Sequence, residues 1–161
     1  AILRQPGSDK VVDRILLVMN AAEEGKAGWA KLDSAMGDPD AAVRYWAAIG
    51  YGNQGKAAPH SAAAMKKALR DPSAVVRIAA ARALCRMDQP AEALPVLAAE
   101  LASPQEWVRL NAAIVLDEAG GQARPVIGAL KKAMEDKENR YVVRVVNHAL
   151  NVLEGTSNEA P

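Results

Sequence analysis

A seven-residue motif that ends in Val-Arg, and in three of its four copies begins with Asp-Pro or Ser-Pro, recurs along the chain at nearly constant spacing. The arginines of its four copies stand 33, 32 and 35 residues apart, at Arg44, Arg77, Arg109 and Arg144. A period of about 20 to 50 residues is typical of repeat architectures, in which each unit stacks on its neighbours. The repeat therefore predicts a linear array of similar units.

Each copy of the motif carries the signals that begin a helix. An acidic or hydroxyl residue stands six positions before each arginine, and proline follows it in three of the four copies. Asp or Ser at the N-cap with Pro at the first helical position is a strong start signal. The capping residues predicted in this way are Asp38, Asp71, Ser103 and Glu138. Each unit is predicted to contain two helices, and the motif marks the start of the second one. These second helices are amphipathic and are expected to begin near Asp40, Ser73, Gln105 and Arg140.

A shorter helical segment precedes each of these starts, and Gly- or Pro-containing breaks separate the units. We therefore predict a single repeat domain over residues 1–161. It comprises a helix over 9–22 as an N-terminal half-repeat, repeats over about 28–53, 57–87, 91–119 and 122–153, and a polar, frayed tail over 154–161.

The composition favours an all-α fold. Alanine occupies 34 positions, whereas the six aromatic residues include no Phe. Alanine is the strongest helix former, while strands prefer β-branched and aromatic residues. The predicted architecture is an α-solenoid of about four helical hairpins plus an N-terminal helix.

Charge, cysteine content and hydropathy limit the partners and leave the compartment open. Twenty basic and nineteen acidic residues give almost no net charge, which disfavours nucleic acid as a partner. The longest apolar runs are far shorter than the roughly 20 residues that span a bilayer, so membrane insertion is not expected. Cys85 alone cannot form an intrachain disulfide, and we expect it to be a small buried side chain.

The Asp-Pro, Val-Arg, Ala-Ala and closing Leu pattern resembles the HEAT repeat over about four units. This resemblance implies a HEAT-like or armadillo-type superhelix, with a convex and a concave face. Three segments also resemble the C-terminal helical extension of secreted bacterial sulfatases. They are DPDAAVRYWAAIG from Asp38, EWVRLNAAIVLD from Glu106, and YVVRVVNHAL from Tyr141 with the later Gly-Thr-Ser-Asn.

The sulfatase resemblance does not extend to catalytic residues. No proline in the chain has Cys or Ser two residues before it, so the sulfatase Cys/Ser-x-Pro-x-Arg motif is missing, as are that family's calcium ligands. His60 and His148 are the only histidines, and no nucleophile or metal partner is spaced to meet them. We therefore predict no enzymatic activity, metal site or cofactor for this chain.

The arginines of the motif allow two interpretations, because equivalent side chains in a solenoid form a line. They could bind an anion, or they could form a structural ladder with capping groups of neighbouring units, which the planar donor fork of arginine suits. We favour the ladder, since buried ionic groups are normally paired. Its predicted members are Asp38, Arg44, Asp71, Arg77, Arg109 and Arg144.

Four aromatic residues stand near the starts of second helices, and they are the best candidates for a contact surface. They are Tyr45, Trp46, Trp107 and Tyr141. For any one of them, packing inside the solenoid is the alternative.

Two functions fit these observations. One is a noncatalytic accessory domain of a secreted bacterial sulfatase that packs on its own upstream catalytic domain or presents a contact surface. The alternative is a freestanding HEAT-repeat adaptor that binds another protein along its concave face. The incomplete first unit favours the accessory domain. The sulfatase resemblance implies a periplasmic or secreted protein, and a cytoplasmic location is the alternative.

Overall fold

The computed structural model describes residues 8–57, 59–136 and 139–160, which are mostly helical. No strand occurs within these ranges, and the all-α prediction is confirmed. The long helices are α1 (Ser8–Glu23), α3 (Ala41–Gln54), α5 (Ala74–Arg86), α7 (Glu106–Ala119) and α9 (Arg140–Glu154). The short helices are α2 (Trp29–Ala35), α4 (Ala62–Ala68), α6 (Ala93–Glu100) and α8 (Ile127–Ala133). Short 3₁₀ segments link them at Gly25–Gly28, Gly55–Ala57, Pro59–Ser61 and Gly120–Val126.

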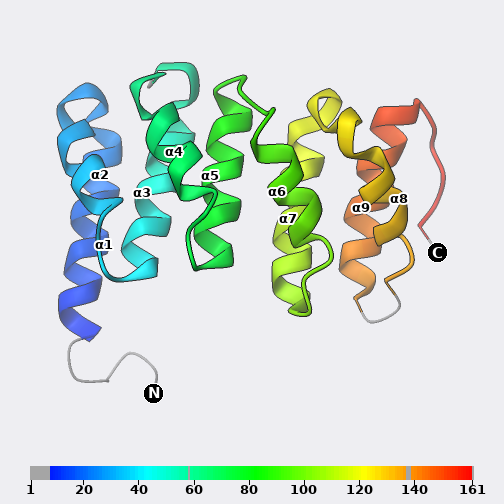
Figure 1. Cartoon of the computed structure of the whole chain (residues 1–161), viewed down its shortest axis with the longest axis horizontal. Helices are drawn as coiled ribbons and strands as arrows, with labels where there is room; N and C mark the ends of the chain where they lie inside the picture. Colours follow the sequence, from blue (N-terminus) through cyan, green and yellow to red (C-terminus); the bar gives the residue numbers. More distant parts are fainter. Residues whose placement is uncertain (1–7, 58, 137–138, 161) are drawn as a thin grey trace.

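The helices form a row of hairpins that runs from α1 at one end to α9 at the other (Figure 1). The long helices contact one another in chain order, α1 with α3, α3 with α5, α5 with α7, and α7 with α9. The short helices form a second layer that packs on the long ones. This arrangement is the predicted α-solenoid, with hairpins α2–α3, α4–α5, α6–α7 and α8–α9 after the N-terminal helix α1.

Alanine pairs allow the long helices to approach closely. The three pairs lie three and four residues after the arginine of the motif, and each of these alanines is fully buried. Helix axes come nearest where the side chains between them are smallest. The pairs are Ala47–Ala48, Ala80–Ala81 and Ala112–Ala113.

The helix starts correct one detail of the sequence interpretation. The N-caps of α3, α5 and α7 are Asp40, Ser73 and Gln105, two residues after the predicted capping residues. The side chains of Asp38, Asp71 and Ser103 instead accept hydrogen bonds from the backbone N–H two residues on. They stabilise the proline-containing turn that leads into the helix, and not the helix itself. Glu138 lies outside the described residues.

Gly28 lies where the chain turns from α1 into α2 and touches the α1 backbone. A Cβ atom at this position would lie 1.8 Å from the carbonyl oxygen of Ala21. The φ angle of Gly28 is −84°, which any residue can adopt. The close approach of the two backbones therefore requires glycine here, and the conformation of the turn does not.

The C-terminal segment is held against α9, so the prediction of a frayed tail was wrong for Gly155–Asn158. The side-chain amides of Asn147 and Asn151 both donate to the carbonyl oxygen of Asn158, at 2.7 and 2.8 Å. The Asn158 N–H donates back to Oδ1 of Asn151, and the Thr156 hydroxyl donates to the same oxygen. The segment runs along the side of α9 that faces away from α7 (Figure 1).

Among the helices that the structure describes, none combines the length and the apolar character needed to cross a bilayer.

Candidate interaction surface

Arg44 and Asp71 join the first two hairpins through a two-pronged ion pair. Arg44 Nε and Nη2 donate to the two carboxylate oxygens of Asp71, at 2.7 and 2.9 Å. Arg44 Nη1 also donates to the backbone carbonyls of Asp38 and Pro39, which belong to its own turn. One guanidinium therefore fastens its own turn to the turn of the next hairpin.

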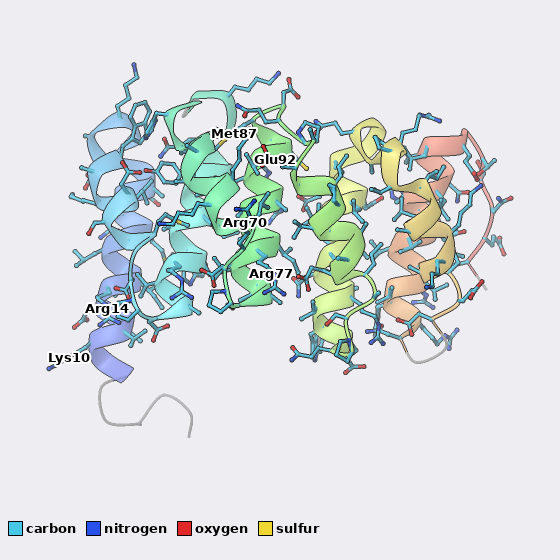
Figure 2. The ribbon with its side chains drawn as sticks, in the orientation of Figure 1. Lys10, Arg14, Arg70, Arg77, Met87 and Glu92 are labelled. Atoms are coloured by element: carbon cyan, nitrogen blue, oxygen red, sulfur yellow. The ribbon has the colours of Figure 1, made fainter. Side chains whose placement is uncertain are left out.

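The same arrangement recurs along the row of long helices. Arg77 pairs with Glu100, Arg109 pairs with Asp136, and both donate through Nη1 to the carbonyl six residues earlier. Arg14 of α1 pairs with Asp38 and adds a member that the motif search missed. Figure 2 shows Arg14 and Arg77 toward the same lower edge of the stack. We call these four ion pairs the arginine ladder.

The ladder differs from the predicted set in its acidic partners. Ser103 replaces the aspartate in the third copy of the motif, and Glu100 from the end of α6 supplies the carboxylate instead. Asp136, by contrast, lies in the turn after α8, two residues past the helix C-cap, which is the position that Asp71 occupies after α4. Only the third unit therefore takes its carboxylate from a different position, the last residue of the preceding helix, and motif alignment does not detect this substitution.

The ion pair between Arg44 and Asp71 shifts the pKa values of both groups. The hydrogen bond from Arg44 is the largest influence on Asp71 and lowers the pKa of its carboxyl. The same bond raises the pKa of Arg44, against the opposing effect of burial. Both groups stay charged across the physiological range. Arg44, Arg77 and Arg109 each donate to a carboxylate and to a backbone carbonyl within the protein.

Arg144 is not a member of the ladder, so its predicted place there was wrong. Arg44, Arg77 and Arg109 each follow their helix N-cap by four residues, but Arg144 follows the N-cap Asn139 by five. One residue turns a side chain by about 100° around the helix axis. Val143 takes the ladder position and is buried, while Arg144 is exposed and its side chain makes no hydrogen bond or ion pair with a described residue.

The exposed large apolar side chains gather on one face of the long helices. They recur at spacings of three, four, seven and eleven residues, which place side chains on one side of a helix. Among the described residues of α1, α7 and α9, all but Leu17 follow this rule. Val75 of α5 lies two residues after its N-cap, the position that Trp107 and Tyr141 hold in their helices. We call the surface the long-helix stripe, and its exposed apolar members are Val12, Leu16 and Met19 of α1, Val75 of α5, Trp107 and Ile114 of α7, and Tyr141 and Val152 of α9.

Two grooves mark the stripe. The first, of about 380 Å³, crosses α3, α5 and α7 and has Ile49, Val75 and Ile114 in its walls. The second, of about 290 Å³, lies between α7 and α9 with Trp107 and Tyr141 in its walls. Trp107 and Tyr141 each lie two residues after the N-cap of their helix, so the repeat itself places the two rings on the same side.

The four candidate aromatic residues fall into two groups. Trp107 and Tyr141 are 69% and 67% exposed. Tyr45 and Trp46 are partly buried, pack against the core, and contact each other edge to face with ring centres 5.6 Å apart. Tyr45 still contributes to the wall of the first groove. The fully buried aromatic residue is Tyr51, whose hydroxyl donates to Asp33 and whose pKa burial raises.

The histidines and the cysteine have structural surroundings. His148 Nδ1 lies 2.6 Å from Asp117 Oδ1 and links α9 to α7. His60 stacks on Trp29, with ring centres 4.0 Å apart. Cys85 is buried, and burial raises its thiol pKa to about 11, which keeps the thiol protonated. Over the described ranges, no group of three or more His, Cys, Asp and Glu side chains could hold a metal ion.

Comparison with known proteins agrees with the repeat geometry. The family model described as HEAT repeats matches the chain twice, over residues 29–117 and 61–151, and so covers most of its length. No curated protein sequence matches the chain. HEAT repeats are generally noncatalytic and often mediate protein interactions. On the strength of the two overlapping matches and the stacked hairpins, the chain belongs to the HEAT-repeat family.

Proposed function

We propose that this chain is a noncatalytic interaction module that binds a polypeptide along the long-helix stripe. The observation that carries the proposal is the placement of the exposed large apolar side chains, nearly all of which lie on this one face. Large apolar side chains that are exposed together on one face are typical of binding surfaces. The other layer of helices has no comparable set among the described residues.

The two grooves suggest where the partner is anchored. Trp107 and Tyr141 are large, exposed and rigid, and side chains of this kind contribute most to the affinity of protein interfaces. The second groove, between α7 and α9, accepts one apolar side chain of the partner. The first groove, across α3, α5 and α7, accepts another. A partner that spans both grooves crosses the long helices and does not follow one of them.

The stripe can be tested by selecting a random peptide library on the immobilised chain. Selected peptides should bind the wild-type chain and lose at least tenfold in affinity to the Trp107→Ala and Ile114→Ser variants, since each removes a wall of a groove. The matched control is Lys67→Ala, on the exposed side of α4. If binding is weakened by Lys67→Ala and unaffected by the stripe variants, the stripe is not the binding surface.

The sulfatase resemblance suggests one specific partner. In this version of the proposal, the stripe packs on the catalytic domain of the same polypeptide, and the chain is the accessory domain of a secreted sulfatase. The three segments that resemble the sulfatase extension support this version. The coding region upstream of Ala1 tests it, because a Cys/Ser-x-Pro-x-Arg motif there is required. A start codon near Ala1 supports the freestanding adaptor instead.

A further inference from the structure

Each long helix contacts the next hairpin through equivalent positions. The position eight residues after the N-cap is a fully buried alanine in α3, α5 and α7, namely Ala48, Ala81 and Ala113. The position four residues later also faces the following unit. A Cβ atom at Gly52 would lie 3.4 Å from Ala83 of α5, and Asp117 binds His148 of α9.

The last long helix has asparagine at both of these positions. Asn147 and Asn151 follow the N-cap Asn139 by eight and twelve residues. They contact the segment that comes directly after α9. Both side-chain amides donate to the Asn158 carbonyl oxygen, and Asn151 also accepts hydrogen bonds from the Asn158 N–H and the Thr156 hydroxyl.

Gly155 makes this return of the chain possible. Its φ angle of +69° is left-handed, and its N–H donates to the Asn151 carbonyl oxygen at the helix end. A Cβ at Gly155 would meet nothing within 4 Å, so the glycine is needed for its conformation and not for space. The Thr156 N–H donates to the same carbonyl oxygen at 3.0 Å, which directs the chain back along α9.

We propose that Gly155–Asn158 is a built-in cap that takes the place of a further hairpin on α9, and that Asn147 and Asn151 are the residues that hold it. Terminal repeats of solenoids need a polar outer face, because the apolar face that stacks on a neighbour would otherwise be exposed. Here the asparagines provide the polar face, and the returning backbone satisfies their hydrogen bonds. While the cap is in place, no helix pair can stack directly on α9.

Amide hydrogen exchange tests the cap at a single proton. In the double variant Asn147→Ala/Asn151→Ala, the Asn158 N–H loses its acceptor, and its exchange should accelerate about tenfold or more. Melting temperature is a poorer measure, because alanine is also a better helix former than asparagine and partly offsets the loss. Unchanged exchange at Leu150 in the middle of α9 verifies that the helix itself is intact.

Two single variants make the test specific. Asn158→Ala keeps the backbone N–H and carbonyl through which Asn158 is held, so its amide should stay protected. Asn111→Ala removes an asparagine whose side chain donates only to Trp107 one turn earlier, and it should leave the exchange at residue 158 unchanged. The proposal is overturned if the double variant leaves the exchange of this amide at the wild-type rate, or if Asn158→Ala accelerates it equally.

Discussion

Arg109 and Asp136 form the most enclosed ion pair of the arginine ladder, with each side chain only 10% exposed and Nε 2.7 Å from Oδ2. The pair joins α7 to the turn that precedes α9, across 27 residues of sequence. Because little water reaches either group, the pair depends on the presence of both partners. Removal of one takes the opposite charge away from a largely enclosed partner.

Arg109→Ala should therefore lower the free energy of unfolding by about 3 kcal/mol. Arg77→Ala should cost less, about 1 to 3 kcal/mol, because the Arg77 side chain is 25% exposed. Arg144→Ala is the matched control, since it removes the fourth arginine of the sequence motif but no ladder contact, and its effect should stay within about 0.5 kcal/mol. Urea unfolding measures all three, and an Arg144 cost as large as that of Arg109 would contradict the register described for α9.

The free energy of unfolding should depend on pH in part through the ionisation of the Asp71 carboxyl group. Its pKa is lowered in the folded chain from the ordinary value of 3.8, mainly by Arg44. Its contribution is therefore complete above pH 3.8 and is lost as the pH falls through the lower, folded-state pKa. Asp71→Asn should reduce stability at pH 7 and also flatten the loss of stability below pH 4, as followed by thermal melting between pH 2 and 7. A parallel displacement of the whole curve would show that the carboxylate does not titrate as described.

Trp107→Ala should separate binding from stability. The ring is 69% exposed, so its loss should change the free energy of unfolding by no more than about 0.5 kcal/mol while weakening partner binding. Leu116→Ala, in the same helix, removes a fully buried side chain and should cost about 2 to 5 kcal/mol. Calorimetric melting of the two variants checks this difference, and a Trp107 variant as unstable as the Leu116 variant would mean that the ring is a core residue.

Two glycine-to-alanine changes should have opposite signs. Gly28→Ala places a methyl group 1.8 Å from the Ala21 carbonyl oxygen and must displace α1 from α2, so it should destabilise the chain strongly. Gly128→Ala lies in α8, where a Cβ meets nothing within 4 Å, and should stabilise the chain by up to about 1 kcal/mol. Thermal denaturation of both variants measures the two changes in stability. Equal changes for Gly28→Ala and Gly128→Ala would show that the α1–α2 contact is looser than described.

The repeat in the sequence was enough to predict the fold. Helix starts near Asp40, Ser73, Gln105 and Arg140 agree with the observed N-caps, because periodic apolar residues and turn residues are local signals. The ladder pairs were harder to predict, because two of the acidic partners lie outside the motif. Only the three-dimensional stacking brings Glu100 to Arg77 and Asp136 to Arg109. Arg14 could have been found, because Ser8 stands six residues before it as in the other copies.

The exposure of the aromatic residues could not be read from their spacing. Trp46 and Trp107 both stand near the start of a long helix, but Trp107 lies two residues after its N-cap and Trp46 lies six after. The difference decides whether the ring stands free at the start of the helix or packs on Tyr45 and the core. Likewise, the asparagines that hold Gly155–Asn158 are ordinary surface residues in sequence, and only their register on α9 reveals their contact.

The one-residue displacement of Arg144 has a consequence for anyone who would lengthen or shorten this protein by design. Alignment on Val-Arg makes the fourth unit look interchangeable with the others, yet a unit copied from it brings a valine where the next junction requires a guanidinium. The second unit carries Arg77 in the ladder register, an apolar residue at the stripe, and an alanine where the next helix must pack. It also supplies Asp71, where the third unit has Ser103, so a copy of the second unit brings both partners of a ladder pair.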